Sequence, residues 1–136
     1  MPASDVNWVA ILVAATAGFM VGGLWYIVLG KPWMRLSGLG PDQLRVGAAL
    51  AYGLGFVCTF VMAYMMSRLI DYVFKAPNKT IGNGLLLGLM LWIGFVATTG
   101  LTNDLFGRRP LMRWVIESGH HLVVLLLMGA ILACCE

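Results

Sequence analysis

Four long apolar segments, separated by short polar turns, constrain this chain more than any other feature. They cover roughly residues 6–29, 46–67, 81–102 and 111–133. About 20 apolar residues in a helix cross the ~30 Å hydrocarbon layer of a bilayer, and each segment reaches that length. Lipid offers no partners for backbone polar groups, which favours helices. The pattern predicts an all-α integral membrane protein, with residues 1–136 forming a single domain of four transmembrane helices.

The composition excludes a water-soluble surface. Of the 136 residues, 60% are apolar and only 11% are charged. Soluble domains carry about 25% charged residues, so the lipid bilayer must be the main partner of this chain. The net charge of +3 does not indicate nucleic-acid binding. The lysines and arginines lie at segment ends, where lipid headgroups and the cytoplasmic preference of positive charges explain them.

The distribution of these basic residues predicts the orientation of the chain. The first and third loops share one side of the membrane and carry most of them. Positively charged loops stay in the cytoplasm, so both termini are expected to be extracytoplasmic. The basic residues of loops one and three are Lys31, Arg35, Arg45, Arg108, Arg109 and Arg113. Those on the other side are Arg68, Lys75 and Lys79.

Small residues recur every four positions in three of the segments. This spacing places them on one helix face, where they let two backbones approach closely. We expect a homo-oligomer, most simply a dimer, to use the Gly18/Gly22 or the Gly84/Gly88 face. The first segment is expected to end in a loop from Gly30 to about Gly40. The predicted helix-packing residues are Gly18, Gly22, Gly47, Ala51, Gly55, Gly84 and Gly88.

The fourth segment carries the most unusual residues of the chain. Arg113, Glu117 and His121 are four apart and share one helix face, and His120 lies about 60° round from Glu117. At 1.5 Å per residue, Glu117 lies roughly 9 Å into the helix and the histidines roughly 14 Å. Ionisable groups at such depth face protein or water and mark functional sites. Their expected companions are Trp25, Tyr26, Tyr52, Thr98, Thr99 and Asn103.

Three interpretations of this intramembrane polar site stay open. In a structural or accessory subunit, Arg113 pairs with Glu117 and the imidazoles hydrogen-bond to neighbouring helices. In a transporter or channel, Glu117 and the histidines bind a cation or relay protons in a cytoplasm-facing cavity. In a metal site, the Glu-x-x-His spacing supplies two ligands and an oligomer or cysteines supply the others. The ligand is unknown in each case, no cofactor is indicated, and no nucleophile or phosphate-loop motif points to an enzyme.

Two stretches of the sequence are similar to each other. Residues 23–35 align with residues 100–113 after one insertion, and both read Gly-Leu, then Gly with a basic residue, then Pro and Met-Arg. Both follow an odd-numbered segment on the same side of the membrane. The similarity indicates either a parallel repeat of two hairpins or similar helix ends that arose independently.

A family resemblance rests on three short motifs. They are the stretch Trp25-Tyr-x-x-Leu-Gly-Lys-x-Trp-Met34, the stretch Leu105-Phe-Gly-Arg-Arg-Pro110, and the end from His121-Leu-Val to Leu-Met-Gly-Ala-Ile131. The chain resembles the small membrane proteins catalogued as domain of unknown function 1761, although it lacks their additional Phe before the Gly-Lys pair. The resemblance covers nearly the whole chain. It implies a four-span bacterial membrane protein and implies no activity. We expect the protein in the bacterial inner membrane.

Overall fold

The computed structural model describes residues 6–40, 42, 47–75 and 77–135, without the side chain of Cys135. Within these residues the chain forms α1 (Trp8–Ser37), α3 (Ala48–Val73), α4 (Ile81–Leu91), η2 (Trp92–Ala97), α5 (Thr98–Phe106) and α6 (Leu111–Cys135). The π-helical turn η2 joins α4 and α5 into one continuous helix. Four helical segments are therefore long and apolar enough to cross a membrane, which confirms the predicted all-α, four-span architecture.

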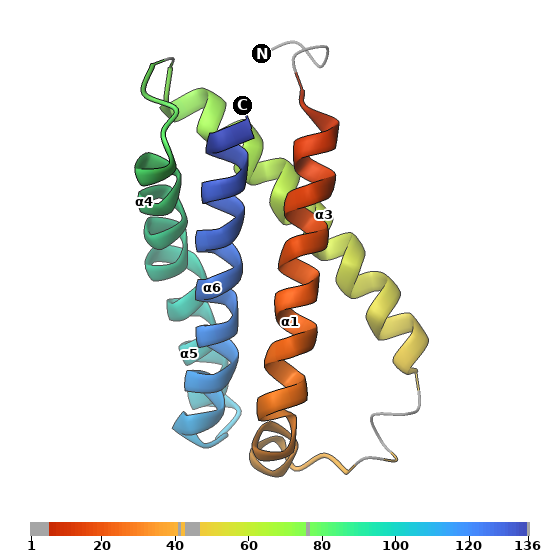
Figure 1. Cartoon of the computed structure of the whole chain (residues 1–136). Coiled ribbons are helices and arrows are strands. Elements are labelled where there is room, and N and C mark those ends of the chain that lie inside the picture. Colours follow the sequence, from red (N-terminus) through yellow and green to blue (C-terminus); the bar gives the residue numbers. More distant parts are fainter. Residues whose placement is uncertain (1–5, 41, 43–46, 76, 136) are drawn as a thin grey trace.

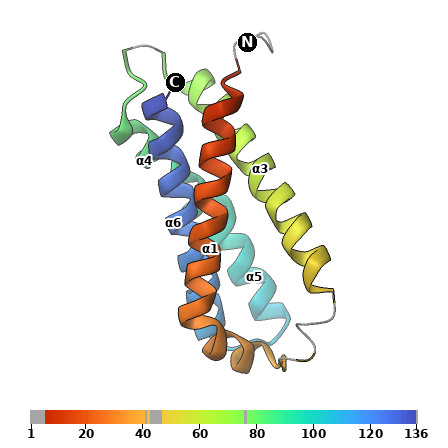
Figure 2. The ribbon, with the colours of Figure 1, turned by 45° about the vertical axis from the view of Figure 1, so that its right-hand side comes forward.

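Helix α6 lies at the centre of the bundle and packs against α4, α1 and α3 (Figures 1 and 2). Successive segments run in opposite directions. The beginning of α1 and the end of α6 consequently lie at one end of the molecule, which we call the terminal end. The C-terminal end of α1 and the turn between α5 and α6 lie at the other, which we call the loop end. This central position explains why α6 carries many of the contacts described below.

The prediction of a loop from Gly30 to Gly40 is wrong for its first eight residues. Helix α1 passes through Pro32 and ends at Ser37. Proline removes one backbone hydrogen bond, but neighbouring groups in membrane helices compensate for such a loss. Here Trp33 packs edge-to-face on Tyr26, with ring centroids 5.5 Å apart. The helix ends where Gly38 adopts a left-handed φ of 72°, which glycine accommodates without strain. In Figures 1 and 2 the last turns of α1 bend away from the rest of the helix.

The glycine faces of α1 and α4 are filled inside the chain. A Cβ on Gly84 would overlap the carbonyl oxygen of Gly129, and one on Gly88 would lie 2.6 Å from the carbonyl oxygen of Leu125. A Cβ on Gly18 would lie 2.9 Å from Cε of Met128. Both faces therefore contact α6, which contradicts their assignment as the surface for a second copy. Oligomerisation itself stays a prediction.

The predicted packing residues of α3 behave differently. Gly55 approaches Phe19, whose ring would lie 3.7 Å from an added Cβ. Gly47 begins α3 with a φ of 74°, and a Cβ there would meet nothing within 4 Å. Ala51 is exposed one turn later. The first turns of α3 therefore contact no other helix through these two small residues.

The closest side-chain packing lies toward the terminal end. Among the described residues, Ile11 of α1, Met66 and Ile70 of α3, and Met128 and Leu132 of α6 are fully buried. All buried residues of α3 lie between Ala63 and Asp71, in its second half. Its first half diverges from α1 toward the loop end (Figure 1). The bundle is thus tight at one end and open at the other.

The two similar stretches of sequence have different conformations. Residues 23–35 are helical throughout as part of α1. Residues 100–113 contain the end of α5, a turn in which Arg108 has a φ of 55°, and the start of α6. The turn is needed because α6 must reverse direction beside α5. The sequence similarity therefore does not correspond to a shared local structure.

Candidate functional site

A buried arginine connects three helices at the loop end. Arg113 is 8% exposed, and its Nη1 donates to Oδ1 of Asp104 at 2.8 Å and to Oε2 of Glu117 at 2.9 Å. Its Nε donates to Oγ of Ser37 at 2.7 Å, and its guanidinium lies 5.7 Å from the ring centre of Trp33. The predicted pairing of Arg113 with Glu117 is present. The arginine also joins the ends of α1 and α5, so it ties the loop end together.

Sequence reasoning missed Asp104, the most buried member of this cluster. Asp104 is 4% exposed, although its position four residues before Arg108 indicates a residue of a basic loop. Arg109 provides a second, more distant cation at 3.6 Å. The sequence feature that could have indicated it is an isolated acidic residue at the end of an apolar segment, nine positions before Arg113. This feature is weak evidence, because the sequence does not show that the intervening turn brings Asp104 close to Arg113.

The two histidines lie next to each other at mid-depth in the bundle. The ring centroids of His120 and His121 are 4.8 Å apart, and Tyr26 packs edge-on against His120 at 5.4 Å. The imidazole of His120 lies against Gly22, and a Cβ added to Gly22 would be only 2.7 Å from Nε2 of His120. Glycine at position 22 therefore leaves room for the imidazole. Both histidines are half-buried. They therefore face other helices of the protein on at least one side.

Tryptophan side chains position these elements by hydrogen bonds to backbone carbonyls. Trp25 donates from Nε1 to the carbonyl of Ile116 at 2.9 Å, which joins α1 to α6 one turn before His120. Trp92 donates from Nε1 to the carbonyl of Ser118 at 2.8 Å, which joins η2 to α6. Each indole satisfies its donor inside the bundle, which a buried tryptophan requires. Both tryptophans therefore connect helices, beyond the interfacial anchoring that is usual for this residue in membrane helices.

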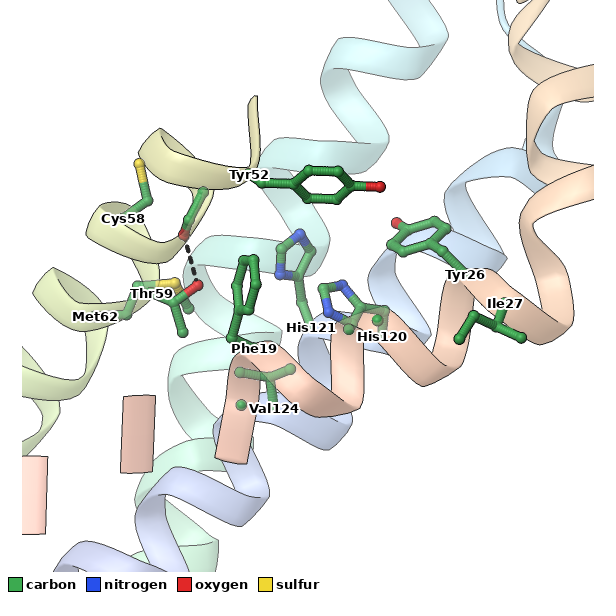
Figure 3. A pocket seen from close by; sticks show the side chains of 14 residues that line it. Phe19, Tyr26, Ile27, Tyr52, Cys58, Thr59, Met62, His120, His121 and Val124 are labelled. Atoms are coloured by element: carbon green, nitrogen blue, oxygen red, sulfur yellow. Dashed lines mark hydrogen bonds between the residues drawn. The ribbon is translucent and has the colours of Figure 1, made fainter. Parts of the chain in front are cut away.

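A pocket of about 450 Å³ opens between α1, α3 and α6 (Figure 3). Its rim includes the exposed residues Ile27, Tyr52 and Cys58, and its inner wall includes both imidazoles. Figure 3 shows the rings of Phe19, Tyr26 and Tyr52 around the two histidines. We call it the histidine pocket. The described residues that line it are Gly18, Phe19, Gly22, Gly23, Tyr26, Ile27, Tyr52, Gly55, Cys58, Thr59, Met62, His120, His121 and Val124.

A second pocket of about 360 Å³ lies on the other side of α6, against η2 and α5. It is more polar, and we call it the carboxylate pocket after Glu117. A π-helical turn beside it fits the frequent occurrence of such turns at functional sites. Among the described lining residues, His121 alone belongs to both pockets. The residues lining the carboxylate pocket are Phe95, Val96, Thr99, Gly100, Asn103, Trp114, Glu117, Ser118 and His121.

The structure brings most of the predicted site residues together, but in two groups. Tyr26 and Tyr52 line the histidine pocket, whereas Thr99 and Asn103 line the carboxylate pocket. Thr98 joins neither group, because it is exposed and its hydroxyl donates to the carbonyl of Gly94 in its own helix. In the part of the chain that the structure describes, no three His, Cys, Asp or Glu side chains converge to hold a metal ion. The metal interpretation therefore lacks a third ligand there.

Comparison with known proteins gives one match. A family model described as protein of unknown function (DUF1761) matches residues 9–133, nearly the whole chain. The chain belongs to the DUF1761 family. No curated protein and no solved structure matches it. The resemblance inferred from the sequence is thereby confirmed, and no function comes with it.

The motif that suggested the DUF1761 family contributes directly to the site. Trp25 and Tyr26 contact His120, and Trp33 covers the guanidinium of Arg113. This DUF1761 protein therefore places the aromatic residues of its first motif against the polar residues of α6. The motif builds one wall of the site in addition to ending a membrane span.

Proposed function

We propose that this protein transports a small, mostly apolar molecule that carries an anionic or hydrogen-bond-accepting group. The observation that carries the proposal is the histidine pocket. Its volume of about 450 Å³ and its apolar, aromatic wall with few polar groups are typical of small-molecule sites. The pocket lies near the middle of α1 and α6, and its rim is exposed between α1 and α3. A molecule dissolved in the bilayer would enter there.

The polar groups of the histidine pocket favour a ligand without positive charge. Two imidazoles and two phenols can each donate a hydrogen bond. Among the described residues, no Asp, Glu, Lys or Arg lines this pocket. The nearby carboxylate of Glu117 lies in the other pocket and is paired with Arg113. The site therefore offers hydrogen-bond donors to an oxygen atom of a ligand. When an imidazole is protonated, it also offers a positive charge.

Transport requires a part that moves, and the first half of α3 is suited to this. Its buried residues all belong to the second half, which packs into the tight terminal end. The first half contributes Tyr52, Gly55, Cys58 and Thr59 to the histidine pocket. Its Phe56 still packs edge-on against Phe19 of α1, and only the turns before Phe56 diverge from the bundle. Swinging the turns around Tyr52 toward or away from α1 would open or close the pocket while the buried residues of the second half stay packed.

Binding at the histidine pocket can be tested with naphthalene-2-sulfonate, a fluorescent anion that stays ionised. Replacing Gly22 by alanine should weaken its binding at least tenfold, because the new methyl group would lie 2.7 Å from Nε2 of His120 and displace the imidazole. Fluorescence titration of the purified protein measures this. Gly30→Ala is the matched control, since a Cβ there meets nothing within 4 Å. Equal affinity in the two variants, or tighter binding of the cation trimethyl-2-naphthylammonium, would contradict the proposal.

We also propose that the protein lies in a bacterial inner membrane with its loop end in the cytoplasm. Six of the nine lysines and arginines lie in the sequence stretches 31–45 and 108–113, which join the first span to the second and the third span to the fourth. A green fluorescent protein fused after Glu136 should then remain dark, and alkaline phosphatase at the same position should be active. The beginning of α1 shares that end of the bundle, so an N-terminal fusion should report the same side. Strong fluorescence from the C-terminal fusion would reverse the orientation.

A further inference from the structure

We propose that protons reach His121 through the carboxylate pocket and accompany the ligand of the histidine pocket, so that transport is proton-coupled. The inference rests on the proposed function and adds its energy source. The observation behind it is that His121 lines both pockets. One imidazole thus faces an apolar ligand pocket on one side and a polar pocket on the other.

The carboxylate pocket provides polar groups at increasing depth from the loop end. Asn103 is exposed and lies three residues before the end of α5, about 4.5 Å from it. Glu117 lies about 9 Å into α6, and His121 about 15 Å. Each can hydrogen-bond to water or to a proton carrier. This series leads from the membrane surface to the imidazole, in the half of the bundle where α3 diverges.

His121 is better placed for this role than its neighbour. His120 lines the histidine pocket only, and its Nε2 is held in the space above Gly22. His121 has access to a polar route on one side and to the ligand on the other. Histidine is also the side chain that gains and loses a proton near neutral pH. We therefore assign ligand contact to both histidines and proton uptake to His121.

The charged and titratable surroundings of His121 are compatible with reversible protonation. On α6 the nearest such groups are His120 and Glu117. Protonated His120 would repel a positive charge on His121, whereas the carboxylate of Glu117 favours that charge. The salt bridge of Glu117 to Arg113 reduces that attraction, and Arg113 is itself paired with Asp104 of α5. From α5 the facing residues Thr99 and Asn103 are uncharged. The remaining titratable residues that line a pocket with His121 are Tyr26 of α1 and Tyr52 and Cys58 of α3.

The proposed cycle moves one proton with each anion. A proton that arrives from the loop end binds the unprotonated ring nitrogen of His121. The resulting imidazolium pairs with the anionic group of the ligand in the histidine pocket. When the pocket opens to the other side, the ligand leaves and the imidazolium returns its proton to water. No covalent bond of the ligand changes. The positive charge compensates the anion inside the membrane, where an isolated charge is costly.

The test uses purified protein in phospholipid vesicles that contain the pH dye pyranine, with potassium and valinomycin holding the membrane potential near zero. Naphthalene-2-sulfonate added outside should enter and acidify the interior by one proton per sulfonate. An imposed inward proton gradient should raise the uptake rate at least tenfold. In His121→Gln, uptake should lose its dependence on the proton gradient. In His120→Gln, sulfonate affinity should fall while the ratio of one proton per sulfonate remains.

The outcomes separate the two proposals. Sulfonate uptake without acidification, or uptake driven by a sodium gradient instead, overturns proton coupling and leaves transport standing. Absence of uptake by the wild-type protein overturns both. An unchanged proton ratio in His121→Gln refutes the role of His121. If that variant fails to fold, as judged by size-exclusion chromatography, the wild-type response to the two gradients still decides whether protons are the coupled ion.

Discussion

Replacing Gly84 by alanine should destabilise the protein by about 3 kcal/mol, the upper end of the range for overpacked sites. The added Cβ would overlap the carbonyl oxygen and carbon of Gly129, and it would lie 2.8 Å from Cβ of Ala133. The obstacle is mainly backbone, which cannot rotate aside as a side chain does. Helices α4 and α6 would have to separate along their length. Unfolding of the purified protein by SDS in mixed micelles measures the loss.

Gly94→Ala provides the matched control for this prediction. It makes the same chemical change in the same transmembrane segment, but a Cβ at Gly94 meets nothing within 4 Å. Because alanine has the higher helix propensity, this variant should be as stable as the wild type or slightly more so. Equal stability of the Gly84 and Gly94 variants would show that α4 and α6 are not packed backbone to backbone.

Replacing Arg113 by methionine should cost about 3–5 kcal/mol, the range for removing one partner of a buried ion pair. Methionine occupies a similar volume but leaves the carboxylate of Asp104, which is 4% exposed, without its 2.8 Å partner. Arg109, at 3.6 Å and half exposed, compensates poorly. The contact with Ser37 is also lost, so the end of α1 should loosen. The same SDS titration measures the change.

A double variant distinguishes loss of charge pairing from loss of packing. Adding Asp104→Leu to Arg113→Met removes the more buried of the two carboxylates that Arg113 pairs with and should recover part of the stability. Recovery should be incomplete, because the half-buried Glu117 still lacks its partner. Arg109→Met is the control for an exposed pair and should change stability by less than about 1 kcal/mol. If the double variant loses as much stability as the sum of its single changes, the two residues are not energetically coupled.

The architecture and one half of the site follow from the sequence alone. Four spans follow from hydropathy because each membrane helix must satisfy its own backbone and face lipid, which are properties of a single segment. The proximity of Arg113, Glu117 and the two histidines follows likewise, since helical periodicity alone brings them together. Polarity and depth predict Trp25 and Tyr26 as companions of this site, and both contact His120.

Which helix faces meet depends on contacts between segments, and these become visible only in the folded chain. The spacing of the glycines in α1 and α4 predicts close helix packing, but the sequence does not show whether the partner is a second copy or α6 of the same chain. Asp104 reaches Arg113 because a turn folds α5 beside α6, and α1 continues through Pro32 because Trp33 and Ser37 gain partners there. The division into two pockets depends on where α3 diverges and where η2 passes α6. These features arise between helices, and the pattern of one segment carries no information about its neighbour's position.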